Sequence, residues 1–417
     1  MRIGIFTETY SPYISGLVTS EIMLKKALEK QGHEVYVVTA NLESFKYEYN
    51  EEEKVLKIPG IPTGIYNSRL SSIYPVRAVN KIKSWNLEVI HSQTEFAIGT
   101  FARLFAKQYN IPLVHTYHTM YEDYIYYITK GYFKRSSKKL LEYFTKFYCD
   151  TTATELIVPT NKTYKLFKEK YKFKKNINII PTGIEVERFF TENINQKEID
   201  KIRKQLKISK KDFIILFVGR LAEEKNVEFL INSQKEIQKK YKNIKLLIVG
   251  DGPDKEKYEN YVESLNIKSN IIFTGKVAWD DMPYYYQIAN IFATASKTET
   301  QGLTIIEAMA SNVVPICIKD EAFLSMITEG LNGLFFETPE EYIKLVFYLY
   351  ENKEELKRFD RQARIQSETY SSKYYAERVL EVYNRAIREK KNENRYGLFS
   401  KISKKIKEIK NDHSTEQ

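Results

Sequence analysis

The sequence predicts an α/β protein made of two doubly wound domains in tandem. Short apolar runs alternate with helical patterns over nearly the whole chain, which is typical of parallel sheets covered by helices on both faces. The chain has 417 residues, more than one hydrophobic core usually supports, and 43% of them are hydrophobic. Each domain can therefore bury a core of its own.

The N-terminal half accounts for the first of the two sheets. Its short runs are rich in Ile, Val and Leu, and most are followed by a segment with a helical repeat. Strands are predicted at residues 3–6, 35–39, 88–91, 113–116, 156–159 and 177–181, and helices at 19–30, 96–109 and 138–148.

The C-terminal half repeats the alternation and adds helices at its end. A polar segment at 192–211 has no strand pattern and the composition of a linker, so we predict domains at 1–190 and 191–371. Strands are predicted at 213–218, 245–249, 271–273, 291–295 and 314–318, with a helix between each pair, and further helices at 339–351, 353–368 and 372–390.

A basic tail, residues 391–417, ends the chain. Residues 385–410 hold ten Lys or Arg and three Glu. Apolar residues recur there at three- to four-residue steps, which predicts a basic amphipathic helix. Two interpretations stay open: a solvated, frayed terminus, or an anchor on a membrane surface. The apolar positions are Phe399, Ile402, Ile406 and Ile409.

Composition narrows the class of protein. The formal net charge of +11 indicates a surface attracted to phosphates, nucleic acid or an anionic membrane, and charge alone does not choose among them. Cys149 and Cys317 stand in apolar surroundings, which favours buried thiols over a disulfide or a metal site. Strand 3–6 begins almost at once and no run of eighteen apolar residues occurs, so we expect a cytoplasmic protein without a spanning helix.

The most informative motif surrounds the start of a helix in the C-terminal half. Glu299 and Glu307 stand eight positions apart, and the helix between them begins near Gly302. Glu307 then lies about 8 Å along the helix axis, at about 1.5 Å per residue. The amides of Gly302, Leu303 and Thr304, at the positive end of the helix dipole, favour an anion such as a phosphate. This arrangement suits a nucleotide-sugar.

Arg220 and Lys225 directly follow the first strand of the C-terminal half. Ligands of open α/β sheets bind at the carboxyl ends of strands, where Arg can hold phosphate oxygens bidentately and Lys supplies a compact charge. The pair therefore suits a diphosphate. The acidic residues that could form a metal-binding Asp-x-Asp motif fit helix starts better, so we expect no metal and no other cofactor. They are Asp280, Asp281, Asp251 and Asp254.

Two loops of the N-terminal half also follow strands. Gly16 allows close approach of a phosphate just before a helix, although the GxGxxG spacing of dinucleotide enzymes is absent. His118 follows strand 113–116, at the edge where active-site loops concentrate. His115, within that strand, is expected to have a supporting role.

These motifs together resemble family 4 of the retaining glycosyltransferases, which have the GT-B fold of two Rossmann-like domains facing a central cleft. Glu299 and Glu307 match the Glu-x7-Glu motif of that family, and the likeness covers most of residues 1–385. It implies that helix 372–390 crosses back onto the N-terminal domain. It also implies a role for each motif. Glu307 binds the donor ribose, Glu299 binds the hexose, and Arg220, Lys225 and the Gly302–Thr304 amides bind the diphosphate. Gly16 lies in a loop that approaches the diphosphate, and His118 contacts the hexose or the acceptor.

The residues from His91 to Gly131 are similar to the 1,2-diacylglycerol 3-glucosyltransferases of low-GC bacteria. This resemblance implies UDP-glucose as donor and diacylglycerol as acceptor, and the sequence does not distinguish this donor from UDP-galactose. We also expect peripheral attachment to the inner face of the membrane. Segment 121–148 interleaves aromatic and basic residues, which suits docking on anionic lipid, although a core-facing helix is the alternative. No nucleic acid partner is expected.

Three other functions remain open on the sequence. The chain could be a family 4 enzyme with another acceptor, because donor binding would be the same. It could be a UDP-sugar 2-epimerase, which shares the fold. A non-catalytic protein that binds membrane or nucleic acid through its basic surface is a third possibility.

Overall fold

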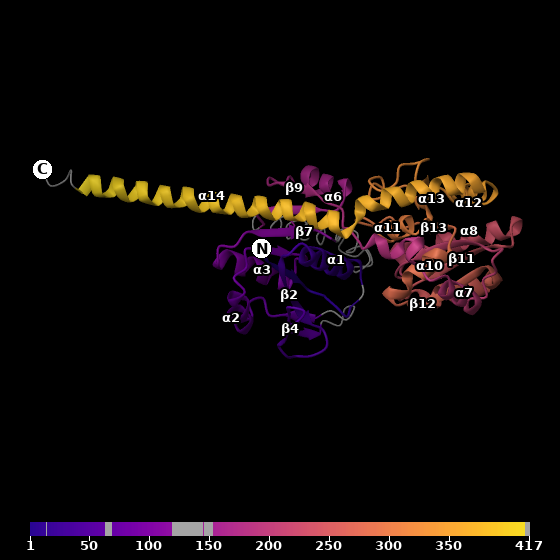
Figure 1. Cartoon of the computed structure of the whole chain (residues 1–417), viewed down its shortest axis with the longest axis horizontal. Helices are drawn as coiled ribbons and strands as arrows, with labels where there is room; N and C mark the ends of the chain where they lie inside the picture. Colours follow the sequence, from indigo (N-terminus) through magenta and orange to yellow (C-terminus); the bar gives the residue numbers. More distant parts are fainter. Residues whose placement is uncertain (14, 63–68, 119–144, 146–152, 413–417) are drawn as a thin grey trace.

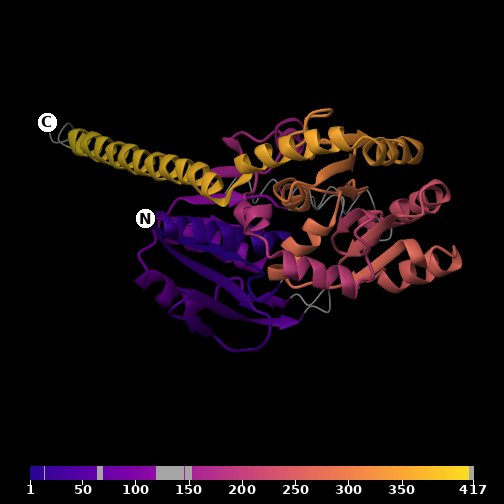
Figure 2. The same cartoon turned by 45° about the vertical axis from the view of Figure 1, so that its right-hand side comes forward.

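The computed structural model describes residues 1–13, 15–62, 69–118, 145 and 153–412. Figure 1 shows two α/β domains side by side, with the last helix lying across the N-terminal domain and projecting beyond it. The turned view in Figure 2 shows the same arrangement. Apart from Thr145, the predicted helix 138–148 lies outside the described residues, as does Cys149.

The N-terminal domain is built on a mostly parallel sheet of order β3-β4-β2-β1-β6-β7-β8-β9. Only β3 and β5 run antiparallel to their neighbour β4. The strands are β1 (Arg2–Thr7), β2 (Glu34–Asn41), β3 (Glu48–Asn50), β4 (Val55–Pro62), β5 (Arg69–Ser71), β6 (Val89–Ser92), β7 (Leu113–Thr116), β8 (Glu155–Val158) and β9 (Ile177–Ile179). The helices are α1 (Gly16–Lys30), α2 (Val76–Ser84), α3 (Ala97–Gln108) and α6 (Asn161–Lys165), which continues as a π-helical turn at Leu166–Lys170.

The C-terminal domain has a fully parallel sheet of order β12-β11-β10-β13-β14-β15. Its strands are β10 (Phe213–Val218), β11 (Ile244–Val249), β12 (Ile271–Gly275), β13 (Ile291–Thr294), β14 (Val314–Ile318) and β15 (Leu334–Phe336). Its helices are α7 (Gln196–Gln205), α8 (Val227–Lys240), α9 (Lys255–Ser264), α10 (Met282–Ile288), α11 (Leu303–Ala310), α12 (Pro339–Glu351) and α13 (Lys353–Ser367), and the chain ends in α14 (Ser372–Asp412).

Continuous apolar runs explain why these strands lie inside. Every residue of β10 from Phe213 to Phe217 is buried, as expected for a strand that helices cover on both faces. In each sheet the strand order reverses once, between β1 and β6 and between β10 and β13. Ligands of doubly wound sheets bind at such points, outside the carboxyl ends of the strands. The order of the strands therefore directs attention to the loops that follow these four.

The last helix belongs to the core of the N-terminal domain. Tyr375, Val379 and Tyr383 of α14 are buried with α1 on one face of the first sheet, while α2 and α3 cover the other face. Arg385 forms an ion pair with the buried Glu155 at the end of the sheet. The helix continues without a break to Asp412, so the backbone shows no division between helix 372–390 and a separate tail.

Two regions differ from the sequence-based expectation. Segment 192–211 is not only a linker, because it contains α7, whose Ile199 and Ile202 are buried in the C-terminal core. The hydrophobic period of this short helix is hard to see among its Lys and Glu residues. The elements β3, β4, β5 and α2 also went unpredicted: β3 and β5 have three residues each, and two prolines interrupt the apolar run of β4. Cys317 is a buried free thiol whose pKa burial raises well above its usual value.

Candidate active site

Loops that follow strands of both domains meet at one place. The Thr300 hydroxyl, after β13, donates a hydrogen bond of 2.9 Å to the backbone carbonyl of His118, after β7. A methyl group placed on Gly16 at the start of α1 would lie 3.8 Å from Leu303 at the start of α11. Two helix N-termini, one from each domain, thus face the same site. Each offers N–H groups that have no partner within its own helix.

Glu299 and Lys225 form an ion pair between the loops after β13 and β10. Their side chains are about four-fifths buried, at 22% and 21% exposure. Burial favours the neutral form of Glu299, but the ion pair and hydrogen bond with Lys225 outweigh it and hold the pKa of that carboxyl below its usual value. The site therefore contains a carboxylate and an ammonium group that neutralise each other.

Arg220 forms an ion pair with the buried Glu224, four residues further along the chain. About a third of the Arg220 side chain remains exposed. This contact holds the guanidinium on the loop after β10, which also carries Lys225. Two cations from one short loop, each supported by an acid, are the arrangement expected for a diphosphate.

The start of α11 depends on Gly302. This residue has a φ of 94°, a conformation that L side chains rarely adopt, and a Cβ there would come to 3.0 Å from the Phe323 ring. The glycine lets the chain turn from the Glu299 loop directly into the helix. The amides of Leu303 and Thr304 consequently lie at the helix N-terminus, next to the Glu299 loop.

Glu307 lies one turn into α11 and is almost completely buried, at 8% exposure. The Tyr286 hydroxyl donates a hydrogen bond of 2.6 Å to its carboxyl group. Burial raises the pKa of Glu307 to about 7, although the bond from Tyr286 and the charge of Arg188 oppose the shift. The carboxyl therefore changes its protonation state near neutral pH.

His118 is held from both domains. Its Nε2 lies 2.6 Å from the Gln93 side-chain oxygen, and its carbonyl accepts the bond from Thr300. Burial lowers the pKa of His118 to about 4, so the ring is neutral at physiological pH. His115 lies in β7 and contacts Glu95 at 2.9 Å and the Ser92 carbonyl at 3.0 Å. Burial lowers the pKa of His115 as well.

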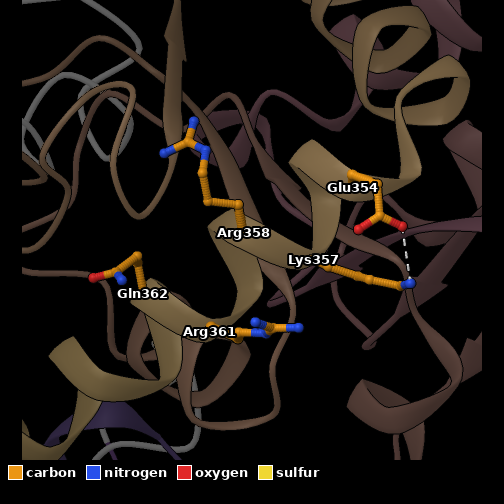
Figure 3. A pocket seen from close by; sticks show the side chains of 5 residues that line it. All are labelled: Glu354, Lys357, Arg358, Arg361 and Gln362. Atoms are coloured by element: carbon orange, nitrogen blue, oxygen red, sulfur yellow. Dashed lines mark hydrogen bonds and ion pairs between the residues drawn. The ribbon is translucent and has the colours of Figure 1, made fainter.

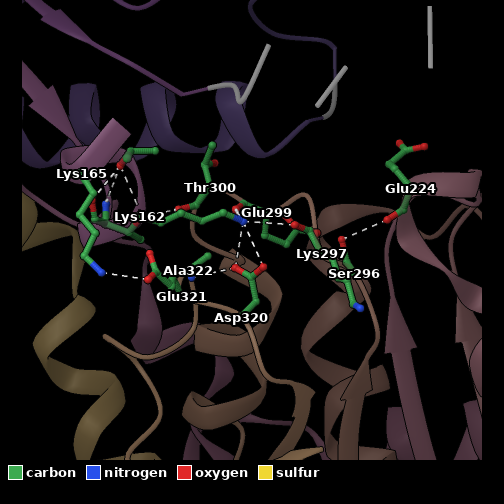
Figure 4. A network of polar contacts seen from close by, with 12 residues as sticks. Lys162, Lys165, Glu224, Ser296, Lys297, Glu299, Thr300, Asp320, Glu321 and Ala322 are labelled. Atoms are coloured by element: carbon green, nitrogen blue, oxygen red, sulfur yellow. Dashed lines mark hydrogen bonds and ion pairs between the residues drawn. The ribbon is translucent and has the colours of Figure 1, made fainter. Parts of the chain in front are cut away.

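Lys162 is a site residue that the sequence analysis missed. It stands in α6 of the N-terminal domain, and its ammonium group donates hydrogen bonds to the carbonyls of Lys297 and Glu299 at 3.1 and 3.4 Å (Figure 4). It also forms an ion pair with Asp320 at 2.9 Å. One lysine of the N-terminal domain thus holds the loop that carries Glu299.

Further hydrogen bonds between the domains surround this lysine. The Thr160 hydroxyl donates to the Thr300 carbonyl at 2.9 Å. Gln301 is paired twice with the backbone of Thr182, at 2.8 and 3.0 Å. The position of Thr160 and Lys162 just after a predicted strand was the available signal, because active-site loops follow strands.

A shallow pocket of about 290 Å³ lies elsewhere, on α13 (Figure 3). Lys357 there is paired with Glu354, and Arg358 with Glu355 and the Gly330 carbonyl. None of its lining residues belongs to the loops after β10 and β13. We assign it no part in the site.

The geometry agrees with what comparison with known proteins shows. A model described as glycosyl transferases group 1 matches residues 198–366, and one described as glycosyltransferase family 4 matches residues 14–188. An alpha-monoglucosyldiacylglycerol synthase of Acholeplasma laidlawii is 36% identical over 392 residues, covering 92% of this chain and 96% of that protein. The chain belongs to the family 4 glycosyltransferases.

Other relatives of this family 4 glycosyltransferase include the alpha-monoglucosyldiacylglycerol synthase of Streptococcus pneumoniae, which is 34% identical, covering 81% of this chain and 75% of that protein. Among solved structures, sucrose-phosphate synthase from Thermosynechococcus elongatus has a TM-score of 0.74 at 17% identity, over 92% of this chain and 98% of its own. Anabaena HepE in complex with UDP-glucose has a TM-score of 0.71 at 16% identity, over 92% and 99%. These two confirm the predicted GT-B fold.

Among the described helices, none combines the length and the apolar character needed to cross a bilayer. Within the residues that the structure describes, no three His, Cys, Asp or Glu side chains are grouped so as to hold a metal ion. The expectation that this glycosyltransferase works without a metal remains a prediction.

Proposed function

We propose that the enzyme transfers a hexose from a UDP-sugar to the 3-hydroxyl of 1,2-diacylglycerol, with retention of the anomeric configuration. Glucose is the hexose that we propose first. The observation that carries this proposal is the Glu299–Lys225 pair beside the N-terminus of α11. Together with Arg220 of the same loop as Lys225, this pair places a carboxylate, two cations and the amides of a helix N-terminus at one switch point. These are the groups that a sugar diphosphate requires.

The described residues suit departure of a nucleoside diphosphate. The leaving group gains negative charge as the glycosidic bond breaks, and preorganised cations and N–H donors stabilise that charge. This stabilisation would come from Arg220, Lys225 and the amides of Gly302–Thr304. Glu307 would bind the ribose, and Glu299 would bind the hexose hydroxyls once the donor displaces Lys225. Attack on the same face, with the leaving phosphate accepting the acceptor proton, accounts for retention without a second catalytic carboxylate.

Diacylglycerol as acceptor is supported by the two synthases of 34% and 36% identity. The aromatic and basic segment 121–148, on which the acceptor interpretation was based, lies outside the described residues except Thr145. We propose that the enzyme works at the cytoplasmic face of an anionic membrane. Its charge of +11 and the projecting helix α14, with its basic sequence beyond residue 390, support this location (Figure 1).

The decisive experiment incubates purified protein with labelled UDP-glucose or UDP-galactose and vesicles containing diacylglycerol, with and without anionic lipid. The proposal predicts an α-linked hexosyl-diacylglycerol whose anomeric configuration NMR can establish, and faster turnover on anionic vesicles. Transfer only to a soluble acceptor would refute the lipid acceptor. Conversion of UDP-N-acetylglucosamine without any acceptor would instead identify an epimerase.

Truncation tests the role of the projecting helix separately. Among the side chains that the structure describes, which reach residue 393 of α14, the last that packs on the N-terminal core is Ile387, so a chain that stops after residue 393 keeps this packing. We expect the shortened enzyme to sediment less with anionic vesicles while it still binds UDP. Equal sedimentation of both proteins would show that the membrane contact lies elsewhere.

A further inference from the structure

A buried chain of hydrogen bonds runs from the C-terminal helix to His118. The Tyr383 hydroxyl of α14 lies 2.6 Å from Nδ1 of His91, and Nε2 of His91 lies 2.6 Å from the Thr116 hydroxyl. The amide nitrogen of Gln93 lies 3.2 Å from the same Nδ1, while its oxygen lies 2.6 Å from Nε2 of His118. The chain joins residues nearly three hundred positions apart in the sequence.

We propose that Gln93 is a positioning residue that holds His118 in the tautomer protonated on Nε2. An amide nitrogen can only donate, so Nδ1 of His91 must accept, and the proton of His91 is on Nε2, facing Thr116. The other end of the amide can only accept, so His118 must donate through Nε2. Its Nδ1 is thereby left as an acceptor. This inference rests on the proposed function, in which His118 contacts the hexose or the acceptor alcohol.

The surroundings preserve this arrangement. His91, Ser92 and Gln93 are at most 2% exposed, so water does not compete for the bonds of His91, while His118 at the end of the network is half-buried. Burial lowers the pKa of His91 and of His118, so both rings stay neutral and each keeps one accepting nitrogen. Besides Tyr383 and the two rings themselves, the titratable groups that act on these rings are His115 and Glu95. A neutral acceptor nitrogen is suited to orienting a hydroxyl group, which is what both a hexose and an alcohol acceptor offer.

The hydrogen bond from Thr300 to the His118 carbonyl connects this hydrogen-bond network to the C-terminal domain, which in the proposed function binds the donor. His118 is therefore fixed through its ring by the N-terminal domain and through its backbone by the loop that carries Glu299. Loss of Gln93 should free the ring while the backbone contact remains. The expected consequence is a fall in kcat with little change in the donor KM.

Nitrogen NMR on protein with ¹⁵N-labelled histidine tests the tautomer without any assay of activity. Only five histidines are present, and single His→Asn variants assign their signals. We expect His118 protonated on Nε2 in the wild type and a mixture of tautomers in Gln93→Leu. A His118 protonated on Nδ1, or a tautomer unchanged in Gln93→Leu, would overturn the proposal.

Kinetics test the positioning role. Gln93→Leu should lower kcat about tenfold, the effect of one lost hydrogen bond at a reacting group, and Gln93→Asn should recover part of it. Tyr383→Phe is the matched control, because it removes one hydroxyl from the same buried chain and keeps the Gln93–His118 bond. Equal losses in Tyr383→Phe and Gln93→Leu would show a merely structural network. An inactive wild type with the NMR signature intact would refute the proposed reaction and leave the tautomer assignment standing.

Discussion

The two domains present different chemistry to the same site. The C-terminal loops offer charges in pairs, Glu299 with Lys225 and Glu224 with Arg220. The N-terminal loops offer neutral hydrogen-bonding groups, because burial keeps the His118 ring uncharged beside Gln93. A donor diphosphate is an anion and an alcohol acceptor is neutral, so each half matches one substrate. This difference is our reason to propose that the second domain binds the donor and that the first orients the hydroxyl group.

The largest effect on the transfer rate is expected from the charged residues of the C-terminal loops. Lys225→Ala and Glu299→Ala should each reduce transfer by about a thousandfold or more, since each removes a group aimed at charge or hydroxyls in the transition state. The measurement is turnover, with circular dichroism to verify the fold. Lys239→Ala is the control, because Lys239 is an exposed lysine paired with Glu236 on α8. Near-normal turnover in either site variant would refute its role and the contrast between the domains.

A smaller effect is expected where the domains are joined. Lys162→Met removes the ammonium group that holds the Lys297 and Glu299 carbonyls, and kcat should fall about ten- to a hundredfold. Lys165→Met is a close control, because the Lys165 ammonium group is half exposed and forms an ion pair with Glu321 across the same boundary. Equal loss of activity in both variants would show that ion pairing between the domains in general is responsible. The hydrogen bonds of Lys162 to the loop that carries Glu299 would then have no special role.

Donor affinity should depend on pH through Glu307. Its pKa is raised to about 7, so the carboxylate that would accept ribose hydrogen bonds is lost as pH falls through 7. UDP binding measured by calorimetry should therefore weaken below pH 7, by up to about tenfold per unit if only the carboxylate binds. Tyr286→Phe removes a bond that lowers this pKa, so the midpoint should move upward. A midpoint that persists in Glu307→Gln would assign the titration to another group.

The smallest effect is expected from metal removal. The cations of the C-terminal loops can stabilise the leaving diphosphate without an ion, so treatment with EDTA should leave the rate within about twofold. A strict requirement for Mg²⁺ or Mn²⁺ would show that Arg220 and Lys225 are insufficient. Stabilisation of the leaving diphosphate would then require a metal ion in addition to the residues of the C-terminal domain.

Sequence patterns could predict the sheets and the donor motif because both are local. Strand runs, the Gly302 turn and the spacing of Glu299 and Glu307 each lie within one short segment. The same reasoning failed for α7, whose polar composition resembles a linker, and for Lys162, which follows a strand without any motif of its own. It assigned Lys225 to a phosphate but could not foresee its pairing with Glu299.

The sequence by itself determined the two doubly wound halves, the family and the residues at the carboxyl ends of the strands. Apolar periodicity and motif spacing act over a few residues and survive without knowledge of distant contacts. Only the tertiary structure decided that Lys162 holds the donor loop, that Tyr383 reaches His91, and that Glu307 is buried enough to titrate near neutrality. Those properties arise from burial and from pairing across the folded chain, which no local pattern encodes.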